Sequence, residues 1–404
     1  MTDSSGTVAA RFEEPWGLLM SLWLLWVFIG AYAIVPASAL PVVTEGTDVG
    51  LAAASWIVTA PPVGAAIAGL PIGAWLDRTD NRRAIVLAGL WLFVVGLLAW
   101  VAGTEELYWP LVATRLLGGV ALVTAWVAGI NLLSAGFTDR YRTTVVAAYA
   151  AGYPAGYALG QFGAPIVTAR LGWPATFPVF GALAAGTLPA CYLAGRGIDR
   201  PPSEGDATLR GAASVLANRD VQVVCVLSFV AYAVYLILNS WLPTYLVAVF
   251  GLSLAESGLF VASVPAIGIA ARTSGGLLAD RAFARRQRPV VVLSFAATTL
   301  VVAALAVLGR IGTLVPFLLG LAAAGFGIQL QIGVLYTYVQ GFVAEETIGT
   351  AVALVAVVGW IGQFVAPALT GALVDRTGNH GVVLVCAVAF AFFGIGIAWF
   401  APDP

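Results

Sequence analysis

Gly160-Gln-Phe-Gly-Ala-Pro165 and Gly362-Gln-Phe-Val-Ala-Pro367 place one uncommon hexapeptide twice in a chain of 404 residues, at an offset of 202 residues. Two further pairs of segments repeat at almost the same offset: Ser38-Ala-Leu-Pro41 with Ser240-Trp-Leu-Pro243, and Gly73-Ala-Trp-Leu-Asp77-Arg78 with Gly276-Leu-Leu-Ala-Asp280-Arg281. Three matches at one shift indicate an internal duplication. The sequence therefore predicts a protein built from two similar halves.

The composition places the protein in a membrane. Apolar residues make up 60% of the chain and charged residues 10%, and the mean hydropathy is +0.95, whereas an average soluble domain has roughly 25% charged residues. The apolar runs are continuous rather than alternating, which excludes a transmembrane β-barrel and favours helices. The three cysteines lie in apolar runs without ligand spacing, so neither a disulfide framework nor a metal site is expected. The first fifteen residues do not resemble a removable signal peptide.

The chain contains twelve apolar runs of about the length that a bilayer-spanning helix needs. A polar segment rich in proline, serine and charged residues divides them into six and six. The predicted organisation is a six-helix bundle at 1–194, a cytoplasmic linker at 195–220 and a second six-helix bundle at 221–404. The predicted spans are 16–36, 53–75, 84–102, 109–132, 144–168, 174–194, 221–246, 256–278, 289–308, 313–338, 348–372 and 381–401.

The distribution of arginine predicts the orientation. All 19 basic residues are arginines. If both termini are cytoplasmic, fourteen arginines fall in cytoplasmic segments and only Arg170, Arg310 and Arg376 fall outside, in agreement with the positive-inside rule. Arg115 and Arg272 lie within predicted spans. We expect a multi-pass protein of a prokaryotic plasma membrane, since the use of arginine alone is typical of a GC-rich genome.

Several loops and helices then support a family resemblance. The segment from Gly73 through Asp77-Arg78 to Arg82-Arg83 resembles the signature loop of the major facilitator superfamily, and the segment from Gly276 to Arg286 resembles its weaker second copy. Arg115-Leu-Leu-Gly118-Gly119 resembles the second motif of that family. The usual glycine after the Asp-Arg pair is replaced by Asp80, and by Phe283 in the second copy. The resemblance implies an all-α fold of twelve transmembrane helices in two pseudo-symmetric bundles, working by alternating access.

The same pattern suggests where a gate lies. A third Gly-x-x-x-Asp-Arg occurs at Gly371 to Arg376, on the outer side, where the resemblance implies an inverted repeat. In such a loop the glycine permits close helix approach, and the aspartate can face a helix N-terminus. The alternative is that the arginines only anchor the loop in the cytoplasm. The predicted gating residues are Gly73, Asp77, Arg78, Arg82, Arg83, Gly276, Asp280 and Arg281.

Charge inside the membrane is the strongest functional signal, because an ionisable residue in a span is costly. Arg272 lies eight residues before Asp280, about 12 Å from the end of its helix, too far for easy snorkelling. Its repeat mate is Gly69. Arg115 lies nearer a predicted helix end, so snorkelling is an alternative there. The resemblance associates Arg115 with the core of the first half and with coupling in antiporters.

A fixed guanidinium predicts an anionic cargo, since it forms paired charge-assisted hydrogen bonds with carboxylates and oxyanions. No Asp, Glu, Lys or His lies in the body of a predicted span, which disfavours proton-driven export of cations. Aromatic residues in the spans are read as packing or interfacial residues unless they line the site, and Gln161 and Gln363 either contact substrate or pair with backbone groups freed by Pro165 and Pro367. The predicted substrate-binding residues are Arg272, Arg115, Asn239, Gln329, Gln331, Asn131, Gln161, Gln363, Tyr32 and Trp360.

The favoured hypothesis is a secondary active or facilitative transporter of a small organic or inorganic anion. The segment from Asn239 to Leu246 followed by Arg272 resembles cyanate-, nitrate- and oxalate-type carriers, although the nitrate pattern would have arginine where Gly69 stands. The segment from Gly152 to Gly160 is similar to an antiporter motif with its order changed. Two alternatives are an exporter of drug-like or hydrophobic compounds and a non-transporting receptor or sensor. No motif indicates an enzyme. We expect a monomer in the lipid bilayer, with a small-molecule substrate and a coupling ion as partners, no cofactor and no nucleic acid.

Overall fold

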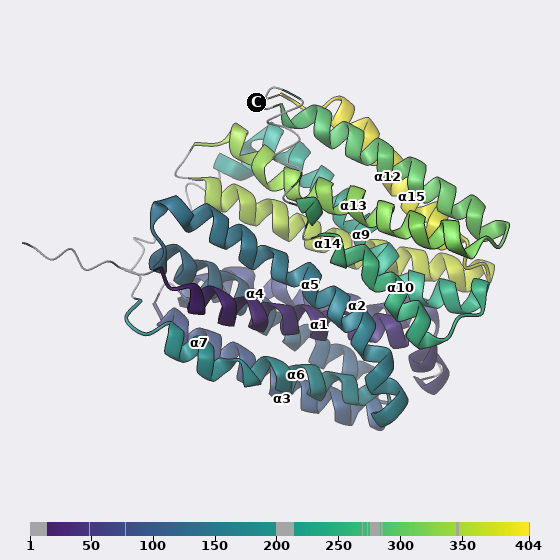
Figure 1. Cartoon of the computed structure of the whole chain (residues 1–404), viewed down its shortest axis with the longest axis horizontal. Helices are drawn as coiled ribbons and strands as arrows, with labels where there is room; N and C mark the ends of the chain where they lie inside the picture. The colour runs from purple at the N-terminus through teal and green to yellow at the C-terminus, as the bar shows by residue number, and fades with distance from the viewer. Residues whose placement is uncertain are drawn as a thin grey trace, which may run out of the picture.

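The fold consists of α-helices arranged in two groups, which follow one another along the chain (Figure 1). The computed structural model describes residues 14–47, 49–76, 78–198, 214–268, 270–272, 274, 283, 286–344 and 347–403. The helices of the first group are α1 (Trp16–Thr47), α2 (Leu51–Leu76), α3 (Asn81–Thr104), α4 (Tyr108–Gly136), α5 (Asp139–Leu171), η1 (Trp173–Ala175), α6 (Thr176–Gly186) and α7 (Leu188–Ala194). Those of the second are α9 (Arg219–Phe250), α10 (Leu254–Ala266), α12 (Gln287–Arg310), α13 (Leu314–Tyr338), η2 (Val339–Phe342), α14 (Ile348–Thr377) and α15 (Val382–Trp399).

The described helices account for the twelve predicted spans. Eleven segments in the described part of the chain are long and apolar enough to cross a bilayer. The twelfth is α5, which has 33 residues but carries glycines, tyrosines and a glutamine that lower its hydropathy, and it packs against α1. The all-α membrane fold is therefore confirmed. The proposed linker at 195–220 lies partly outside the described residues, and we keep the division at 1–194, 195–220 and 221–404 as a proposal.

At two places proline explains how the helices differ from the predicted spans. The first helix continues from the predicted end at 36 to Thr47 through Pro36 and Pro41, and Arg115 of α4 donates to the Tyr32 carbonyl that Pro36 leaves unpaired. The sixth span is divided into η1, α6 and α7. Pro189, at the start of α7, has no amide hydrogen for the carbonyl of Ala185, so the helix breaks there.

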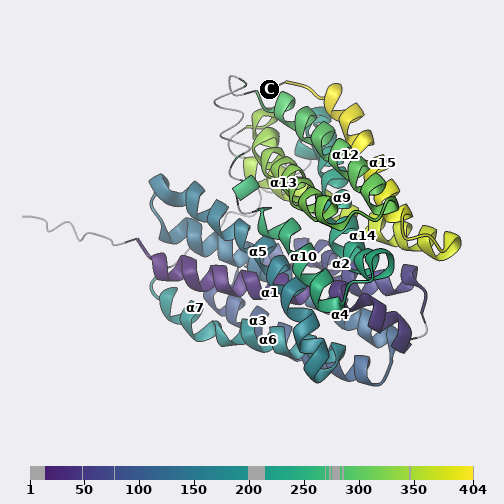
Figure 2. The same ribbon diagram turned by 45° about the vertical axis from the view of Figure 1, so that its right-hand side comes forward.

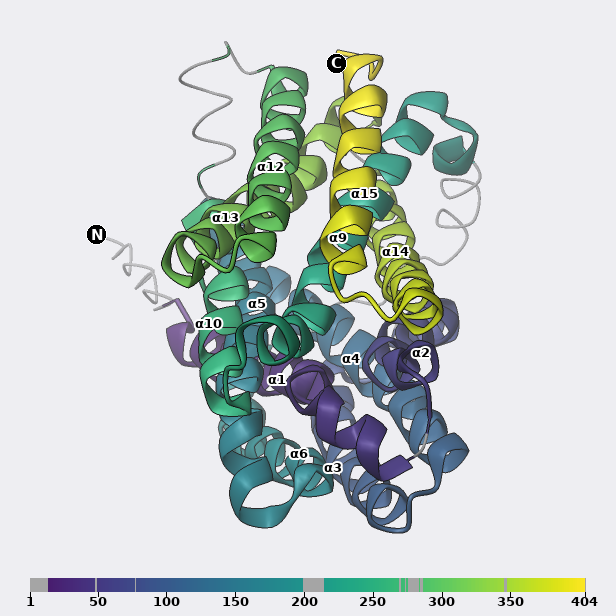
Figure 3. The same cartoon turned by 90° about the vertical axis from the view of Figure 1, so that its right-hand side faces the viewer.

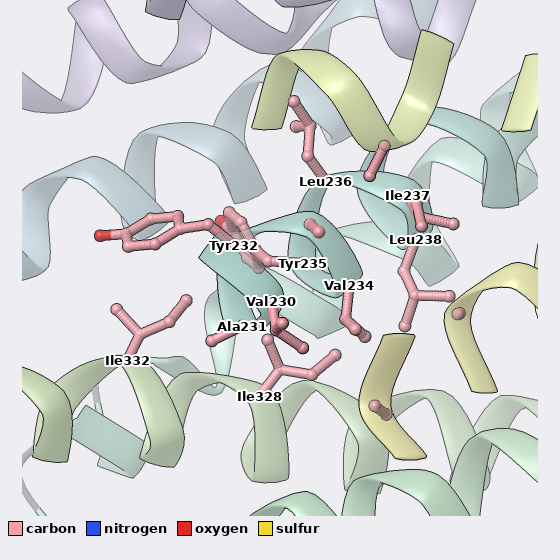
Figure 4. Close-up of a cluster of buried hydrophobic side chains, with 14 of the residues drawn as sticks. Val230, Ala231, Tyr232, Val234, Tyr235, Leu236, Ile237, Leu238, Ile328 and Ile332 are labelled. Carbon is pink, nitrogen blue, oxygen red and sulfur yellow. The ribbon is translucent and has the colours of Figure 1, made fainter. Parts of the chain in front are cut away.

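The structure has two hydrophobic cores, and the core of the second group extends into α1, α2 and α5 of the first. In the second group, α9 is buried along most of its length, and Figure 4 shows its Val230 beside Ile328 of α13. The first group has a core formed by α1, α3, α4 and α6. The groups meet where α2 packs against α14, α5 against α10, and α1 against α9. Figures 2 and 3 show these helices at the boundary between the two groups.

Two hydrogen bonds between the groups lie near one end of the bundle. The carboxylate of Asp375, at the end of α14, accepts hydrogen bonds from the backbone N–H of Leu51 at 2.9 Å and of Ala52 at 2.8 Å, at the start of α2. We call this end, which is predicted to be extracellular, the outer end. An added Cβ at Gly371 would lie 3.0 Å from Ala52, so glycine permits the close approach of α14 to α2 there. The third Gly-x-x-x-Asp-Arg thus places its aspartate on a helix N-terminus of the other group.

Candidate functional site

The candidate site is a cavity between the two groups of helices. It has a volume of about 450 Å³ and is walled by aromatic side chains from both groups. An adjoining cavity of about 1040 Å³ shares Trp126, Ala356 and Trp360 with it and is almost wholly apolar. The first cavity is lined by Trp26, Leu122, Trp126, Ala150 and Tyr153 from the first group, and by Tyr232, Arg272, Tyr336, Ala356 and Trp360 from the second.

Among the described residues of this lining, Arg272 supplies the only charged side chain. Its Nε donates to Oε1 of Gln329 at 2.8 Å. The two terminal nitrogens make no hydrogen bond with a described residue and remain accessible from the cavity. An added Cβ at Gly268 would lie under 3.0 Å from the side chain of Gln329, and one at Gly333 would lie under 3.0 Å from the backbone of Arg272. These glycines therefore let the two helices approach. One bond orients the guanidinium and leaves its fork open to a ligand.

Arg115, the second arginine within a span, is placed differently. It is fully buried in the first group, with 0% of its surface exposed, and lines neither cavity. Its nitrogens donate to three backbone carbonyls, those of Ile57 at 2.9 Å, Tyr32 at 3.0 Å and Ala33 at 2.5 Å. The guanidinium also lies over the rings of Tyr32 and Phe177, at 4.7 and 5.1 Å.

The carbonyls that Arg115 contacts have a specific need for a donor. The carbonyls of Tyr32 and Ile57 precede Pro36 and Pro61 by four residues. Because proline has no N–H, these two carbonyls lack their usual helical partner, and in a bilayer an unpaired carbonyl is costly. The Arg115 guanidinium supplies the missing donors and joins α4 to α1 and α2.

Gln161 serves a similar purpose between the two groups. Its Nε2 donates to the carbonyl of Asn239 at 2.6 Å, and this carbonyl precedes Pro243 by four residues. The hydroxyl of Ser38 donates to the side-chain oxygen and, at 3.3 Å, to the backbone oxygen of Gln161, which Pro165 leaves unpaired. Gln161 therefore joins α5 to α9 and does not line the cavity.

The other predicted polar residues line neither cavity. The Nδ2 of Asn239 donates to the carbonyl of Tyr235 at 2.8 Å, and Gln331 donates to Thr298 at 2.9 Å. Asn131 donates to the oxygen of Asn81 at 3.0 Å. Gln363 is buried, and neither atom of its amide has a hydrogen-bond partner among the described residues. Of the ten predicted binding residues, the structure brings together Arg272, Gln329 and Trp360 at the cavity.

The sequence identified only some of the other residues that line the cavity. Trp26, Trp126, Tyr153, Tyr232 and Tyr336 are aromatic residues within predicted spans, and their periodicity did not separate cavity walls from helix packing. Leu122, Ala150 and Ala356 carry no signal of their own, because small and apolar residues occur throughout the spans. Only the packing of the two groups identifies them.

The two signature loops are described only in part. Four of the predicted gating residues lie outside the described residues: Asp77 in the first loop, and Gly276, Asp280 and Arg281 in the second. Gly73 lies in α2 with open space around it, and Arg78 is exposed in the following turn.

Asp80, which stands where the family loop has glycine, caps α3. Its side chain accepts from the backbone N–H of Arg82 at 2.8 Å. It also lies 3.9 Å from Nε of Arg82 and 3.7 Å from Nε of Arg83. Arg82 stacks over the ring of Tyr192 at 4.4 Å. The departure from glycine thus supplies an N-cap, and Arg82 holds the loop against α7.

Comparison with known proteins places the chain in one group of membrane carriers. The profile of the Major Facilitator Superfamily matches residues 20–367. The nitrite extrusion protein of Bacillus subtilis is 23% identical over 93% of this chain and 90% of its own length, and the probable nitrate/nitrite transporter NarK2 of Mycobacterium tuberculosis is 26% identical over 84% and 85%. The gallate transporter of Pseudomonas putida is 22% identical over 89% and 86%.

A solved structure has the same fold. It is a bacterial homologue of the human lysosomal transporter Spinster, in an inward-facing and unoccupied conformation, and it superimposes with a TM-score of 0.77. The match covers 97% of both chains at 15% sequence identity, so it supports the arrangement of helices alone.

Proposed function

We propose that this chain, which belongs to the Major Facilitator Superfamily, carries a small organic or inorganic anion across the prokaryotic plasma membrane by alternating access. The observation that carries the proposal is the open guanidinium of Arg272 in the cavity between the two halves. Arg272 is half-buried, and a positive charge drawn partly out of water is costly when no carboxylate pairs with it, as is the case among the described residues. A bound anion removes that cost through charge-assisted hydrogen bonds.

The surroundings of Arg272 support an anion over a cation. Among the described residues, the lining of both cavities contains no aspartate, glutamate or histidine. The single histidine of the chain, His380, lies in the turn between α14 and α15, where partial burial lowers its pKa. A cationic cargo would therefore meet one fixed positive charge and no negative one.

The names of the relatives agree with this reading. The nitrite extrusion protein and the gallate transporter carry anions according to their names. Their identity to this chain is below 25%, so the substrate of this chain rests on its own site. For the orientation, we propose that both termini are cytoplasmic, because this places most of the arginines inside. We further propose that the protein acts as a monomer, with a coupling ion.

One observation favours a second candidate function. The adjoining cavity of about 1040 Å³ is lined mainly by apolar residues, including Val123, Leu216 and Leu354, and a cavity of this kind suits a hydrophobic compound. Under that hypothesis, the protein exports drug-like compounds and Arg272 contributes only to packing.

Transport by the Arg272→Gln variant separates the two functions. Purified protein is reconstituted in vesicles, and the flux of labelled anions and of a lipophilic cation is measured. The loss of charge-assisted bonds should lower anion flux by at least about tenfold and leave the flux of the lipophilic cation no lower than in the wild type. Arg170→Gln removes an exposed arginine at the end of α5 and should transport as the wild type. Unchanged anion flux in Arg272→Gln would overturn the proposal.

A further inference from the structure

We propose that the substrate is a monocarboxylate with a flat aromatic or conjugated body, whose carboxylate binds Arg272 and whose body lies against the tryptophans of the first half. The inference rests on the proposed anion transport and specifies the class of anion. It follows from three features of the cavity: the number of positive charges, the aromatic rings of the first half, and the aromatic side chains of the second half.

The number of charges limits the substrate to one carboxylate. Among the described residues that line the two cavities, Arg272 is the only basic one. Its repeat mate, Gly69, lies in the wall of the larger cavity, and an added Cβ there would meet only Val123, at 4.0 Å. The space for a second cation exists, but the first half does not provide one. The second carboxylate of a dianion would therefore lose its hydration without gaining a counter-charge.

The first half contributes a cluster of stacked aromatic rings to the cavity wall. Trp26 and Trp126 stack with their centroids 5.3 Å apart and an interplanar angle of 28°. Trp126 also stacks on Tyr149 at 13°, and Tyr153 is tilted against Trp26 at 5.0 Å and 31°. Because these rings cover part of one another's faces, the aromatic surface that stays open includes that of Trp126, which is partly accessible and lines both cavities. The neighbouring rings hold Trp126 in place, and a fixed ring favours offset or edge-to-face contact with another π-system.

The second half closes the cavity from the other side. Trp360 lines both cavities, so a planar body would lie between tryptophans of the two halves. The hydroxyls of Tyr232 and Tyr336, two residues of the same lining, are hydrogen-bonded to each other at 2.6 Å, so each already has a polar partner. A small inorganic oxyanion would engage the guanidinium but leave this aromatic surface uncovered, whereas an aromatic carboxylate would bury both.

Calorimetric binding to the purified wild-type protein in lipid nanodiscs tests the inference without any variant. Benzoate should bind about three- to tenfold more tightly than cyclohexanecarboxylate, which has a ring of similar size without a π-system. Benzoate should also bind at least about tenfold more tightly than nitrate, because nitrate buries no ring. Phthalate should bind more weakly than benzoate because of its second carboxylate.

A tryptophan variant then assigns the preference to the wall. Trp126→Leu should reduce the affinity for benzoate to that for cyclohexanecarboxylate, while the affinity for acetate stays unchanged. Trp126→Phe, which keeps a flat ring, should retain most of the preference and shows that a tryptophan at this position is not needed for folding.

The outcomes distinguish the two proposals. Equal binding of benzoate, cyclohexanecarboxylate and nitrate, with loss of all three in Arg272→Gln, would overturn the aromatic inference and leave anion transport standing. If benzyl alcohol binds as well as benzoate, and Arg272→Gln binds both normally, the proposed anion function itself fails, and the inference fails with it.

Discussion

The two arginines within spans have opposite environments, although the sequence presents them alike. Arg115 in the first half is fully buried and donates to three backbone carbonyls. Arg272 in the second half makes one hydrogen bond, to Gln329, and faces a cavity between the halves. The comparison shows that a guanidinium in a membrane has a structural role where neighbouring prolines leave carbonyls unpaired, and is open to a ligand where they do not.

The largest expected effect comes from removing the structural arginine. Arg115→Gln should lower the free energy of unfolding by at least about 3 kcal/mol, because the carbonyls of Tyr32 and Ile57 lose charge-assisted donors inside the bilayer. Thermal unfolding of the detergent-solubilised protein measures the loss. Arg272→Gln serves as the matched control and should lose at most about 1 kcal/mol, since it gives up one hydrogen bond.

The opposite result would assign a transport role to Arg115. If Arg115→Gln keeps the wild-type unfolding temperature and loses only transport, then Arg115 contacts substrate in another conformation, as its resemblance to the antiporter residue suggested.

The fold was predictable because its determinants are local in sequence. Continuous apolar runs define spans, and the doubled Gly-Gln-Phe-x-Ala-Pro reveals the two halves before any contact is known. The prediction of Arg272 as a cavity residue used only its distance from a helix end, and the structure places it in the cavity lining.

The partners of the buried polar groups were not predictable, because they arise only when helices from different parts of the chain pack. Pro36 and Pro61 identify carbonyls that lack a donor, yet nothing in the sequence pairs them with Arg115. For Gln161, the structural alternative was that its amide pairs with a backbone group freed by the nearby Pro165. The amide instead donates to a carbonyl freed by Pro243, in the other half. The sequence thus shows which carbonyls lack a helical donor, but it does not show which side chain supplies one.

A smaller effect should follow from removing the contact that Asp375 makes between the halves. Loss of its two hydrogen bonds to the N-terminus of α2 should weaken the outer contact by about 1.4 kcal/mol, which raises the population with an open outer end roughly tenfold. The labelling rate of a cysteine at Val49 by a membrane-impermeant maleimide, in Asp375→Ala, measures this population.

The matched control for Asp375 is Glu256, a carboxylate at the same outer end. Glu256 forms a capping box with Ser253 on its own helix, α10, and does not join the halves. Glu256→Ala should therefore leave the labelling rate unchanged. Equal rates in Asp375→Ala and the wild type would show that the packing of α2 on α14 closes this end without the carboxylate.

The last comparison separates the two repeat-mate glutamines. Gln161→Leu should cost about 1 to 2 kcal/mol in unfolding free energy, because the Asn239 carbonyl and the Ser38 hydroxyl lose a partner. Gln363→Leu should cost nothing or stabilise the protein slightly, because it removes two buried polar atoms that have no partner among the described residues. Thermal unfolding of both variants, side by side, gives the difference.

Equal losses in the two variants would identify a second pairing. The repeat mate of Asn239 is Ala37, and its carbonyl precedes Pro41 by four residues, so it lacks the same helical donor. Gln363 is the symmetric counterpart of the amide that meets this need in the other half. A cost for Gln363→Leu as large as that for Gln161→Leu would mean that Gln363 reaches the Ala37 carbonyl in another conformation, and that the two glutamines are paired in different states of the transport cycle.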